Sequence, residues 1–286
     1  MNTKPVELIP VTVVVPVRNE EANLARCLQR LGEFAEVVVV DSGSTDRTRD
    51  IALEHGARYV NFEWTGGYPK KRNWFMLNHE IPTEWIFFLD ADELVDEDFT
   101  KALRHALAGT DCAGFWLNYT NYFMGRRLDH GLPQRKLALF RKGRALFERI
   151  EEDSWSSLDM EVHEHPIVEG NVGEIKPRID HRDDRGLRKF VEKHTEYAQW
   201  EAGRILLLRE SADPSGRRHL TLRQKAKYAL LGAWWYPALY FAYTYVVRLG
   251  FLDGRAGFTY ASMKYWYLTL IQGFITEAAD RESPST

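Results

Sequence analysis

An apolar run that ends abruptly in acidic residues limits most strongly how this chain can fold. Residues 85–89 are all apolar and are bounded by polar sequence, which is typical of a buried strand in a largely parallel sheet. Side chains two positions apart on an extended backbone share a face, so Asp90 and Asp92 can converge just past the strand's carboxyl end. Open α/β sheets bind ligands at that edge, and two carboxylates there suit Mg²⁺ or Mn²⁺. Alternatively, the two acids only cap a turn and the helix after it.

Strand-like and helix-like segments alternate through the first hundred residues. Apolar and β-branched runs predict strands over residues 11–15, 36–40, 57–60 and 85–89. Helical patterns fall on residues 19–31, on the stretch from a turn at 42–46 to about residue 54, and on residues 70–78. Pro16 is expected to end the first strand, and Asn19 to cap the first helix. This rhythm predicts a doubly wound, Rossmann-like α/β fold with a mostly parallel sheet.

The pattern changes from residue 114. Residues 115–123 are aromatic and partly alternating, which predicts an antiparallel strand, and residues 136–142 offer a returning strand. Residues 187–209 predict a long helix, and a polar break follows at 211–218. We therefore expect two domains, an α/β domain over residues 1–185 and a helical C-terminal appendage over residues 186–286.

Charge and cysteine content exclude some classes of function. The net charge of −3 argues against a nucleic-acid-binding protein, which would normally present a basic face. Cys27 and Cys112 lie far apart with no partner spacing, so a reduced cytosolic setting fits better than a disulfide framework. The N-terminus has no signal-peptide pattern and leads directly into a strand. Catalysis is therefore expected inside the cell.

Four loop motifs occur in order at the carboxyl ends of the predicted strands. They are Pro-Val-Arg-Asn-Glu-Glu at 16–21, Val-Asp-Ser-Gly-Ser-Thr-Asp at 40–46, Lys-Arg-Asn at 71–73 and Asp-Ala-Asp at 90–92. Over about residues 10–185 the chain thereby resembles the inverting family 2 glycosyltransferases of the GT-A fold. Val-His-Glu at 162–164, Gly170, Gly173, His181 and the segment 250–258 resemble the branch that builds lipopolysaccharide core and exopolysaccharide.

The resemblance implies a nucleotide-sugar donor, with UDP-glucose favoured. The donor-binding residues that it implies are Pro16, Arg18, Asn19, Glu20, Asp41, Arg72 and Asp90. A guanidinium such as that of Arg72 can bind a diphosphate in bidentate fashion. Simpler structural roles remain open: Asp41 can cap the turn after it, Glu20 can favour a helix dipole, and Arg72 can be a solvated helix charge.

Metal and base follow from the same resemblance. Asp92 is the expected main ligand of Mg²⁺ or Mn²⁺, together with Asp90 and His165, and the metal would neutralise the departing nucleotide diphosphate. Glu164 is the first choice for the base that activates the acceptor hydroxyl, with Asp159 or Glu161 behind it. Alternatively, residues 161–165 are an edge strand with solvated charges.

Two departures from related sequences refine the expected activity. Relatives usually show arginine where this chain has Ala138, which leaves a phosphate contact from that strand in doubt, and the Gln-x-x-Arg-Trp signature of processive synthases is absent. Transfer of a single hexose to a lipid-linked saccharide is therefore favoured. A sugar-phosphate nucleotidyltransferase is one alternative, but the loop after its first strand should be rich in glycine with a lysine. A non-catalytic nucleotide-binding scaffold is another.

An uncharged stretch in the C-terminal region bears on location. Residues 228–247 carry no charge, are rich in Trp and Tyr, and contain Pro237. Basic residues come before this stretch, namely Arg217, Arg218, Arg223, Lys225 and Lys227. We expect a monotopic helix or hairpin on the inner leaflet of the cell membrane. A packed core helix or a homodimer contact is the alternative.

Overall fold

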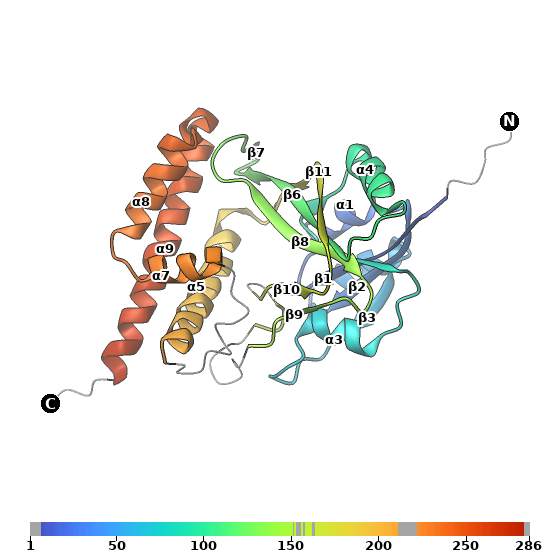
Figure 1. The fold of residues 1–286 in the computed structure, drawn as a ribbon, viewed down its shortest axis with the longest axis horizontal. Helices are drawn as coiled ribbons and strands as arrows, with labels where there is room; N and C mark the ends of the chain where they lie inside the picture. The colour runs from blue at the N-terminus through green and yellow to red at the C-terminus, as the bar shows by residue number, and fades with distance from the viewer. Residues whose placement is uncertain are drawn as a thin grey trace. The chain divides into compact units, whose positions relative to one another are not determined.

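The chain forms two compact units. The computed structural model describes residues 7–150, 152, 156, 158–161, 164–210 and 222–282 (Figure 1). Met1–Gly125 and Pro133–Arg185 make up the first unit, and Arg126–Leu132 and Gly186–Thr286 make up the second. The short segment 126–132 thus belongs with the C-terminal helices, although it lies within the sequence of the first unit.

The first half of the first unit is the predicted parallel sheet. Its strands are ordered β3-β2-β1-β4, with β1 at Ile9–Val17, β2 at Phe34–Asp41, β3 at Arg58–Asn61 and β4 at Trp85–Phe88. Helices α1 (Leu24–Leu28), α2 (Thr48–Glu54) and α3 (Lys71–Asn78) lie between these strands in the chain. The strand order reverses between β1 and β4, where a doubly wound sheet binds its ligands. The predicted fold class is confirmed.

The second half of the sheet is mixed. Beyond β4 the order is β8-β6-β11-β5, with β8 at Gln134–Arg141, β6 at Gly114–Phe123, β11 at Val172–His181 and β5 at Glu93–Leu94. β8 pairs antiparallel with β4 and β6, while β11 pairs parallel with β6 and antiparallel with β5. Helix α4 (Glu97–Leu107) follows β5, and β9 (Ala145–Phe147) pairs with β10 (Pro166–Val168) in a separate small sheet. The pairing of β11 with β5 places His181 opposite Glu93.

Two local predictions around the first loop were wrong. Pro16 does not end β1 but lies inside it, opposite Val40 of β2. The pairing of β1 with β4 stops at Val14. Pro16 has no backbone N–H to donate, but β4 no longer pairs with β1 at that position, so no donor is required there. Asn19 does not cap a helix: its backbone is left-handed with a φ of 55°, and α1 begins only at Leu24.

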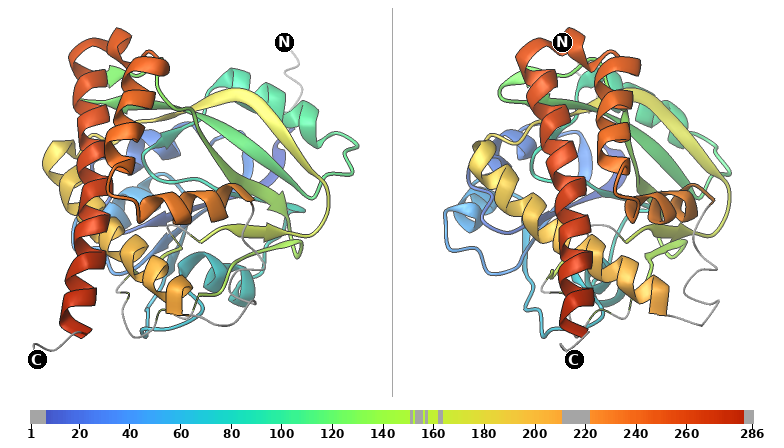
Figure 2. Two further views of the ribbon diagram at one scale, coloured as in Figure 1. Left: turned by 60° about the vertical axis from the view of Figure 1, so that its left-hand side comes forward. Right: turned by 90° about the vertical axis from the view of Figure 1, so that its left-hand side faces the viewer.

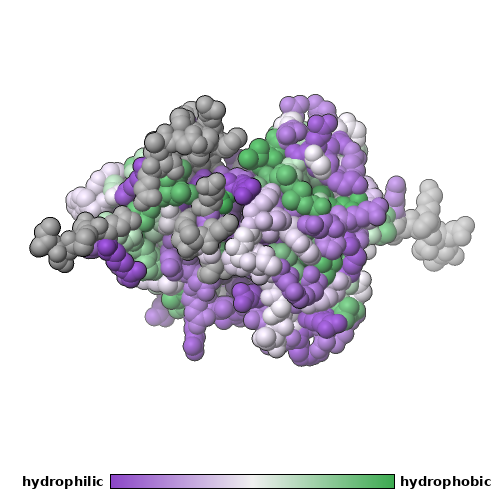
Figure 3. Space-filling view, turned by 90° about the horizontal axis from the view of Figure 1, so that it is seen from below, coloured by the Kyte–Doolittle hydropathy of each residue, from purple (hydrophilic) through white to green (hydrophobic). Residues whose placement is uncertain are grey.

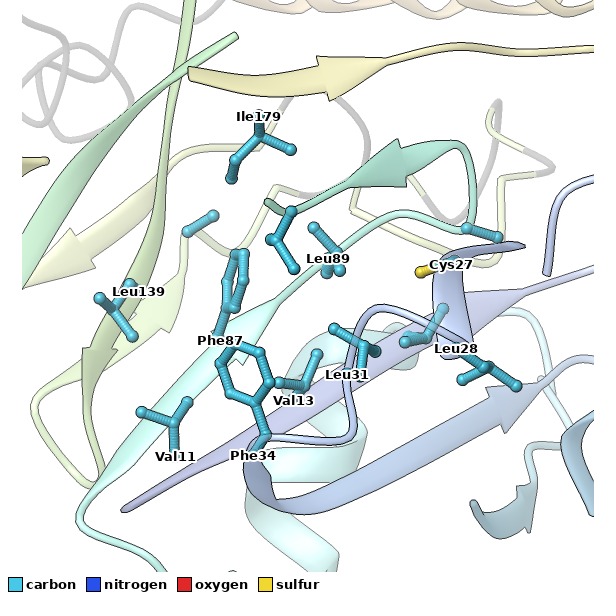
Figure 4. Packing of buried hydrophobic residues seen from close by; sticks show 14 of the residues in the cluster. Val11, Val13, Cys27, Leu28, Leu31, Phe34, Phe87, Leu89, Leu139 and Ile179 are labelled. Carbon is cyan, nitrogen blue, oxygen red and sulfur yellow. The ribbon is translucent and has the colours of Figure 1, made fainter. Parts of the chain in front are cut away.

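Alternate residues of the central strands fill two cores, one on each face of the sheet. On one face Val13 and Phe87 pack with Phe34 and with residues of α1 (Figure 4). On the other face the neighbouring residues of β1 and β4 pack with Phe75 of α3. Burial on both faces explains why these strands are continuous apolar runs.

The second unit is helical. Its helices are α5 (Gly186–Glu210), α7 (Leu222–Leu231), α8 (Tyr236–Ala242), the π-helical turn η1 (Tyr243–Val247), the 3₁₀ turn η2 (Gly250–Asp253) and α9 (Gly254–Glu282). Figure 2 shows α9, in red, running beside α8 and α5, and their shared core includes Ala198, Ile205, Leu268 and Ile271. Residues 126–132, from the first half of the chain, also belong to this unit, and β7 (Arg126–Arg127) lies at the start of that segment.

The uncharged stretch 228–247 is not one helix. α7 ends at Leu231, a turn follows, and α8 begins with Pro237 in its first turn, where proline is tolerated. The amide of Gln272 on α9 donates to the carbonyls of Leu231 and Ala233, at 3.2 and 2.6 Å, and so satisfies the end of α7. Within the described residues, no helix combines the length and the apolar character that crossing a membrane requires.

Truncation of Phe87 should measure how much the central core contributes. Phe87 is fully buried, with ring centroids 6.4 Å from Phe34 and 5.9 Å from Phe99. We expect Phe87→Ala to lower the free energy of unfolding by about 3–5 kcal/mol, because it removes apolar contacts and leaves a cavity. Urea denaturation measures this change. Leu77→Ala, at a position 53% exposed on α3, is the control and should change stability by about 0.5 kcal/mol or less.

Candidate active site

Asp90 lies just past the carboxyl end of β4, held by two cations. Arg72 Nη2 donates to its Oδ1 at 2.7 Å, and Lys136 Nζ donates to its Oδ2 at 2.7 Å. Burial alone would raise the pKa of Asp90, but Lys136 and Arg72 outweigh it and hold that pKa well below its ordinary value. Asp90 is therefore an ionised carboxylate across the physiological pH range.

Lys136 is a site residue that sequence reasoning missed. Its ammonium also binds Glu93 Oε1 at 2.5 Å and lies 5.2 Å from the ring centre of Tyr119. Burial would lower the pKa of Lys136, but Asp90 and Glu93 raise it well above its ordinary value. The strand that lacks an arginine at Ala138 thus supplies a cation two residues earlier.

Asp92 is buried and faces His181. Its Oδ2 lies 3.4 Å from Nε2 of that ring, and Nδ1 of the same ring lies 3.0 Å from Oδ1 of Asn121. An amide oxygen only accepts hydrogen bonds, so Nδ1 donates to Asn121. Nε2 then faces the carboxylate either as a second donor or, in the tautomer that carries its proton on Nδ1, as an acceptor that can share a metal ion with Asp92. Sequence reasoning noted His181 only as part of a family pattern.

His165 lies elsewhere. Its Nδ1 is 3.2 Å from Oε1 of Glu148, beside the small β9–β10 sheet. Among the interactions of the described residues, none joins His165 to Asp90 or Asp92. The structure thus brings Asp92 together with His181, and not with His165.

The two loops beyond β1 and β2 bind each other. Asp41 is fully buried and accepts from Ser44 N and Oγ, at 3.1 and 2.6 Å, and from the Tyr59 hydroxyl at 2.8 Å. Burial, together with Asp41, raises the pKa of Tyr59 to about 12. Asn19 Oδ1 accepts from Thr45 N at 2.8 Å. Asp41 therefore caps its turn, as the simpler structural alternative expected.

The remaining residues of the first loop differ in their surroundings. Pro16 is buried, whereas Arg18 is exposed. Glu20 Oε1 binds Arg185 Nη1 at 2.6 Å, and Glu20 Oε2 accepts from Asn23 at 3.0 Å. Glu20 thus ties the loop after β1 to the end of the first unit.

A second, buried cluster surrounds Glu164. Lys70 Nζ lies 2.8 Å from Glu164 Oε1 and 2.5 Å from Glu152 Oε1. Burial, together with neighbouring Glu152, raises the pKa of Glu164 to about 7 although Lys70 opposes the shift. The three side chains line a cavity of about 10 Å³, which is room for about one water molecule. A carboxyl group that titrates near neutral pH has the strength that a general base requires.

The two other candidate bases are occupied at the N-terminus of α3. The Glu161 carboxylate accepts from the backbone N–H groups of Arg72 and Asn73, at 2.9 and 3.0 Å. The Asp159 carbonyl accepts from Lys71 N at 3.0 Å, and its carboxylate lies 3.4 Å from Lys71 Nζ. Glu161 and Glu164 are both buried outside any strand, so the solvated edge strand is the wrong alternative for these described residues.

Arg72 connects Asp90 to the segment that carries Glu161. Besides Asp90 it binds the carbonyl of Glu161, and its guanidinium lies 5.4 Å from the ring centre of Phe147 and 5.9 Å from that of Phe88. Its side chain is only 12% exposed, so it is not a solvated helix charge. Asp90 and the acids around Glu164 are thus bound by Arg72 and Lys70, two residues apart at the N-terminus of α3.

Comparisons with known proteins extend this description. The sequence model described as "Glycosyl transferase family 2" matches residues 12–157. The lipopolysaccharide core biosynthesis glycosyltransferase LpsC of Rhizobium meliloti (strain 1021) is 30% identical over 176 residues, 59% of this chain and 61% of that protein. A TPR repeat-containing protein of Synechococcus elongatus is 36% identical over 107 residues, 37% of this chain and 26% of that protein. The chain thus spans less than two thirds of the length of these relatives.

A likeness to solved structures is also found. The mannosyltransferase PcManGT from Pyrobaculum calidifontis, solved in complex with GDP-Man and Mn²⁺, matches with a TM-score of 0.49 and 18% sequence identity. That match covers 96% of this chain and 90% of the mannosyltransferase chain.

Removal of Lys70 should destabilise the protein in a pH-dependent way. Lys70→Met leaves Glu152 and Glu164 buried without their cation, and we expect a loss of about 3–5 kcal/mol at pH 8. The pKa of Glu164 then lies still further above the value of about 4.3 that it has in an unfolded chain. The folded variant therefore holds protons that the unfolded chain releases, so the loss shrinks toward pH 5.

Urea denaturation of wild type and variant across this pH range measures the effect of Lys70→Met. Lys101→Met, at an exposed position on α4, is the matched control and should show no such pH dependence. A loss that is constant with pH would contradict the assigned burial of the two glutamates.

Proposed function

The chain belongs to glycosyl transferase family 2, and from this premise we propose that it transfers one hexose, with inversion, from a nucleoside-diphosphate sugar to a lipid-linked saccharide. UDP-glucose is the favoured donor, and lipopolysaccharide or exopolysaccharide biosynthesis is the favoured context, by the similarity to LpsC. The observation that carries the proposal is the opposite tuning of two acids beside the N-terminus of α3: Arg72 and Lys136 keep Asp90 ionised, whereas burial holds the pKa of Glu164 near neutrality. Residues 1–185 would bind the donor and perform catalysis.

We propose that the donor lies across the carboxyl ends of β1 and β4. The backbone around Pro16, Arg18 and Asn19, together with Asp41, would surround the nucleotide base and ribose. Glu20 would fix this loop through its ion pair with Arg185. Arg72 and Asp90 would position the diphosphate and the ribose. The support for this arrangement is that the strand order reverses at this edge, where such sheets bind ligands.

Asp92 and His181 would hold Mg²⁺ or Mn²⁺. The support is that a carboxylate and an imidazole oriented by Asn121 face each other. A protein site with one carboxylate suits these ions because substrate phosphates and water complete their coordination. A bound cation would neutralise charge on the departing nucleotide diphosphate. We favour His181 over His165 as the histidine ligand, with Asp90 nearby.

Glu164 is the proposed base. It would take the proton of the acceptor hydroxyl while that oxygen attacks the anomeric carbon from the face opposite the diphosphate. The bond from the anomeric carbon to the diphosphate oxygen breaks, and the nucleotide diphosphate leaves. Lys70 and Glu152 set the proton affinity of Glu164, whereas Glu161 and Asp159 accept hydrogen bonds at the N-terminus of α3. The loop after β1 has no glycine or lysine over 16–20, which counts against a nucleotidyltransferase.

We propose that residues 186–286 contact the inner leaflet of the cell membrane, where a lipid-linked acceptor would be met. Trp234 is 86% and Trp235 42% exposed in the turn before α8, as suits interfacial anchors. On the face shown in Figure 3, hydrophobic residues break the hydrophilic surface in several places. Of the basic residues named above, Lys225 is exposed, Lys227 binds Glu201 at 2.5 Å, and Arg217 and Arg218 lie outside the described residues. A homodimer contact is the competing explanation.

Loss of the metal site should abolish activity. We expect Asp92→Asn and His181→Ala to lower metal-dependent release of nucleotide diphosphate at least a hundredfold while far-UV circular dichroism stays unchanged. Purified protein incubated with a panel of UDP- and GDP-sugars, with and without chelator, gives the measurement and identifies the donor. His165→Ala is the matched control. Full activity in excess chelator, or loss in His165→Ala only, would contradict the proposal.

Glu164→Gln tests the base. The amide keeps size and hydrogen bonding but accepts no proton, so transfer should fall roughly a hundredfold or more while donor affinity survives. In the wild type, transfer should decrease as pH falls below about 7, because Glu164 is then protonated. Initial rates across pH 5.5–8.5 measure both effects. If Glu164→Gln transferred the sugar at a near-normal rate, the role of base would instead belong to Asp159 or Glu161.

The turn before α8 provides the membrane test. Replacing both Trp234 and Trp235 by Ser should weaken co-sedimentation with anionic liposomes and impair transfer to a lipid-linked acceptor more than donor hydrolysis. Equal binding by wild type and double variant, or binding by neither, would instead favour a homodimer contact. Sedimentation velocity of both proteins distinguishes that case.

A further inference from the structure

The second unit contains a cavity that none of the roles above uses. Its volume is about 50 Å³, several times what one water molecule needs. Leu128 and His130 line it from the segment 126–132, Tyr240 from α8, and Tyr260 and Lys264 from α9. All of these residues belong to the second unit, so the cavity is a property of that unit alone.

The segment 250–258, prominent in the sequence, builds the wall of this cavity. Asp253 accepts from the backbone N–H groups of Asp129 and His130, at 3.2 and 3.0 Å, and lies 2.9 Å from Nδ1 of His130. A Cβ atom on Gly257 would overlap the carbonyl oxygen of Gly250, so η2 can lie on α9 only because residue 257 is a glycine. A Cβ atom on Gly250 would come within 2.9 Å of the carbonyl oxygen of Thr244, so residue 250 packs closely against η1. The cavity is thus held open by hydrogen bonds and by close backbone packing.

Lys264 brings an unpaired positive charge to this cavity. Among the residues that the structure describes, no carboxylate pairs with its ammonium, whose neighbours are the rings of Tyr260 and Tyr267, at 5.5 and 5.6 Å from their centres. Asp253 lines the same cavity, but its oxygens are occupied by the donors from 129 and 130. Burial, and then the charge of Lys227, lower the pKa of Lys264 to about 8. An anion in the cavity would relieve this cost, because it supplies the missing opposite charge.

Exposed apolar side chains surround the lining residues in the chain. Leu239 precedes Tyr240, Val246 lies in the π-helical turn η1, and Phe251, Leu252 and Phe258 come from the segment that forms the wall; all are exposed. A cationic cavity beside an apolar surface matches a molecule with an anionic group next to hydrocarbon. A soluble anion has no hydrocarbon that could contact the exposed apolar residues.

We propose that this cavity binds the phosphate group of a lipid, with Lys264 as its cation and the exposed apolar residues of α8, η1 and η2 against the hydrocarbon. The inference rests on the proposed membrane contact of the second unit and gives it a specific headgroup site. It does not depend on the transfer reaction, which the donor assay tests separately.

Vesicle flotation of the full chain tests the site. The vesicles are phosphatidylcholine alone, or phosphatidylcholine with one fifth phosphatidylglycerol. We expect Lys264→Met to lose tenfold or more in affinity for the anionic vesicles and to keep the weak binding to neutral ones. Arg255→Met is the matched control, since it removes one exposed charge from the same helix outside the cavity. It should lose no more than about fivefold, the effect of one charge near an anionic surface.

Further variants keep the test decisive. Lys264→Met removes an unpaired charge and should fold at least as well as wild type; Lys264→Gln is a second neutral variant, and Lys264→Arg should retain the preference. In a parallel arm, inorganic phosphate at constant ionic strength should raise the melting temperature of the wild type and not of Lys264→Met.

Three results would overturn the proposal. Equal behaviour of wild type and Lys264→Met toward anionic vesicles and phosphate removes the site. A phosphate effect through Lys264 without any vesicle preference identifies a soluble anion and excludes the lipid. Failure of the wild type to bind either vesicle removes the membrane contact as a whole, while glycosyl transfer can still be intact.

Discussion

Three consecutive cations at the beginning of α3 hold the candidate site of the first unit together. Lys70 lies between two buried glutamates, Lys71 donates to the Val17 carbonyl at the end of β1, and Arg72 binds Asp90 past the end of β4. A helix N-terminus already carries partial positive charge, so further cations are unfavourable there without nearby acids. The irregular segment around Glu161 supplies those acids and caps the free N–H groups of α3. The edge of the sheet proposed to bind the donor, the proposed base Glu164 and helix α3 therefore depend on one another.

Buried ion pairs of this kind add little net stability, because desolvation offsets their attraction. Their effect here is to fix proton affinities. Two cations bind Asp90, and their effect outweighs burial and the neighbouring charge of Asp92, so the pKa of Asp90 falls. Glu164 is buried beside a second carboxylate, and Lys70 offsets these effects only in part, so the pKa of Glu164 rises. The two acids thus differ: one is a permanent anion, and the other exchanges a proton near neutrality.

Sequence periodicity predicted the parallel half of the sheet, because its central strands β1, β2 and β4 contain short apolar runs that are largely buried. It did not indicate β11, whose sequence contains glycine, proline and charged residues and which becomes a strand only by pairing with β6. The pairings of β11 bring His181 to Asp92, and the pairing of β8 with β4 brings Lys136 to Asp90. Both pairings join strands far apart in the sequence, so neither contact was predictable. Asp90 and Asp92 could be predicted as a pair because they are neighbours in the chain. Glu164 was one of three candidates until burial beside Lys70 distinguished it.

The contact between Gly250 and Gly257 has a consequence for how this segment can evolve. Backbone meets backbone there, so selection acts on the absence of a side chain, and no compensating change elsewhere can make room for one. Phe251 and Leu252, between the two glycines, point to solvent and are free of that restriction. A segment whose backbone is fixed at two glycines and whose apolar middle is exposed can change the surface that it presents without altering the path of the chain. Relatives that share the path can therefore differ in what they touch.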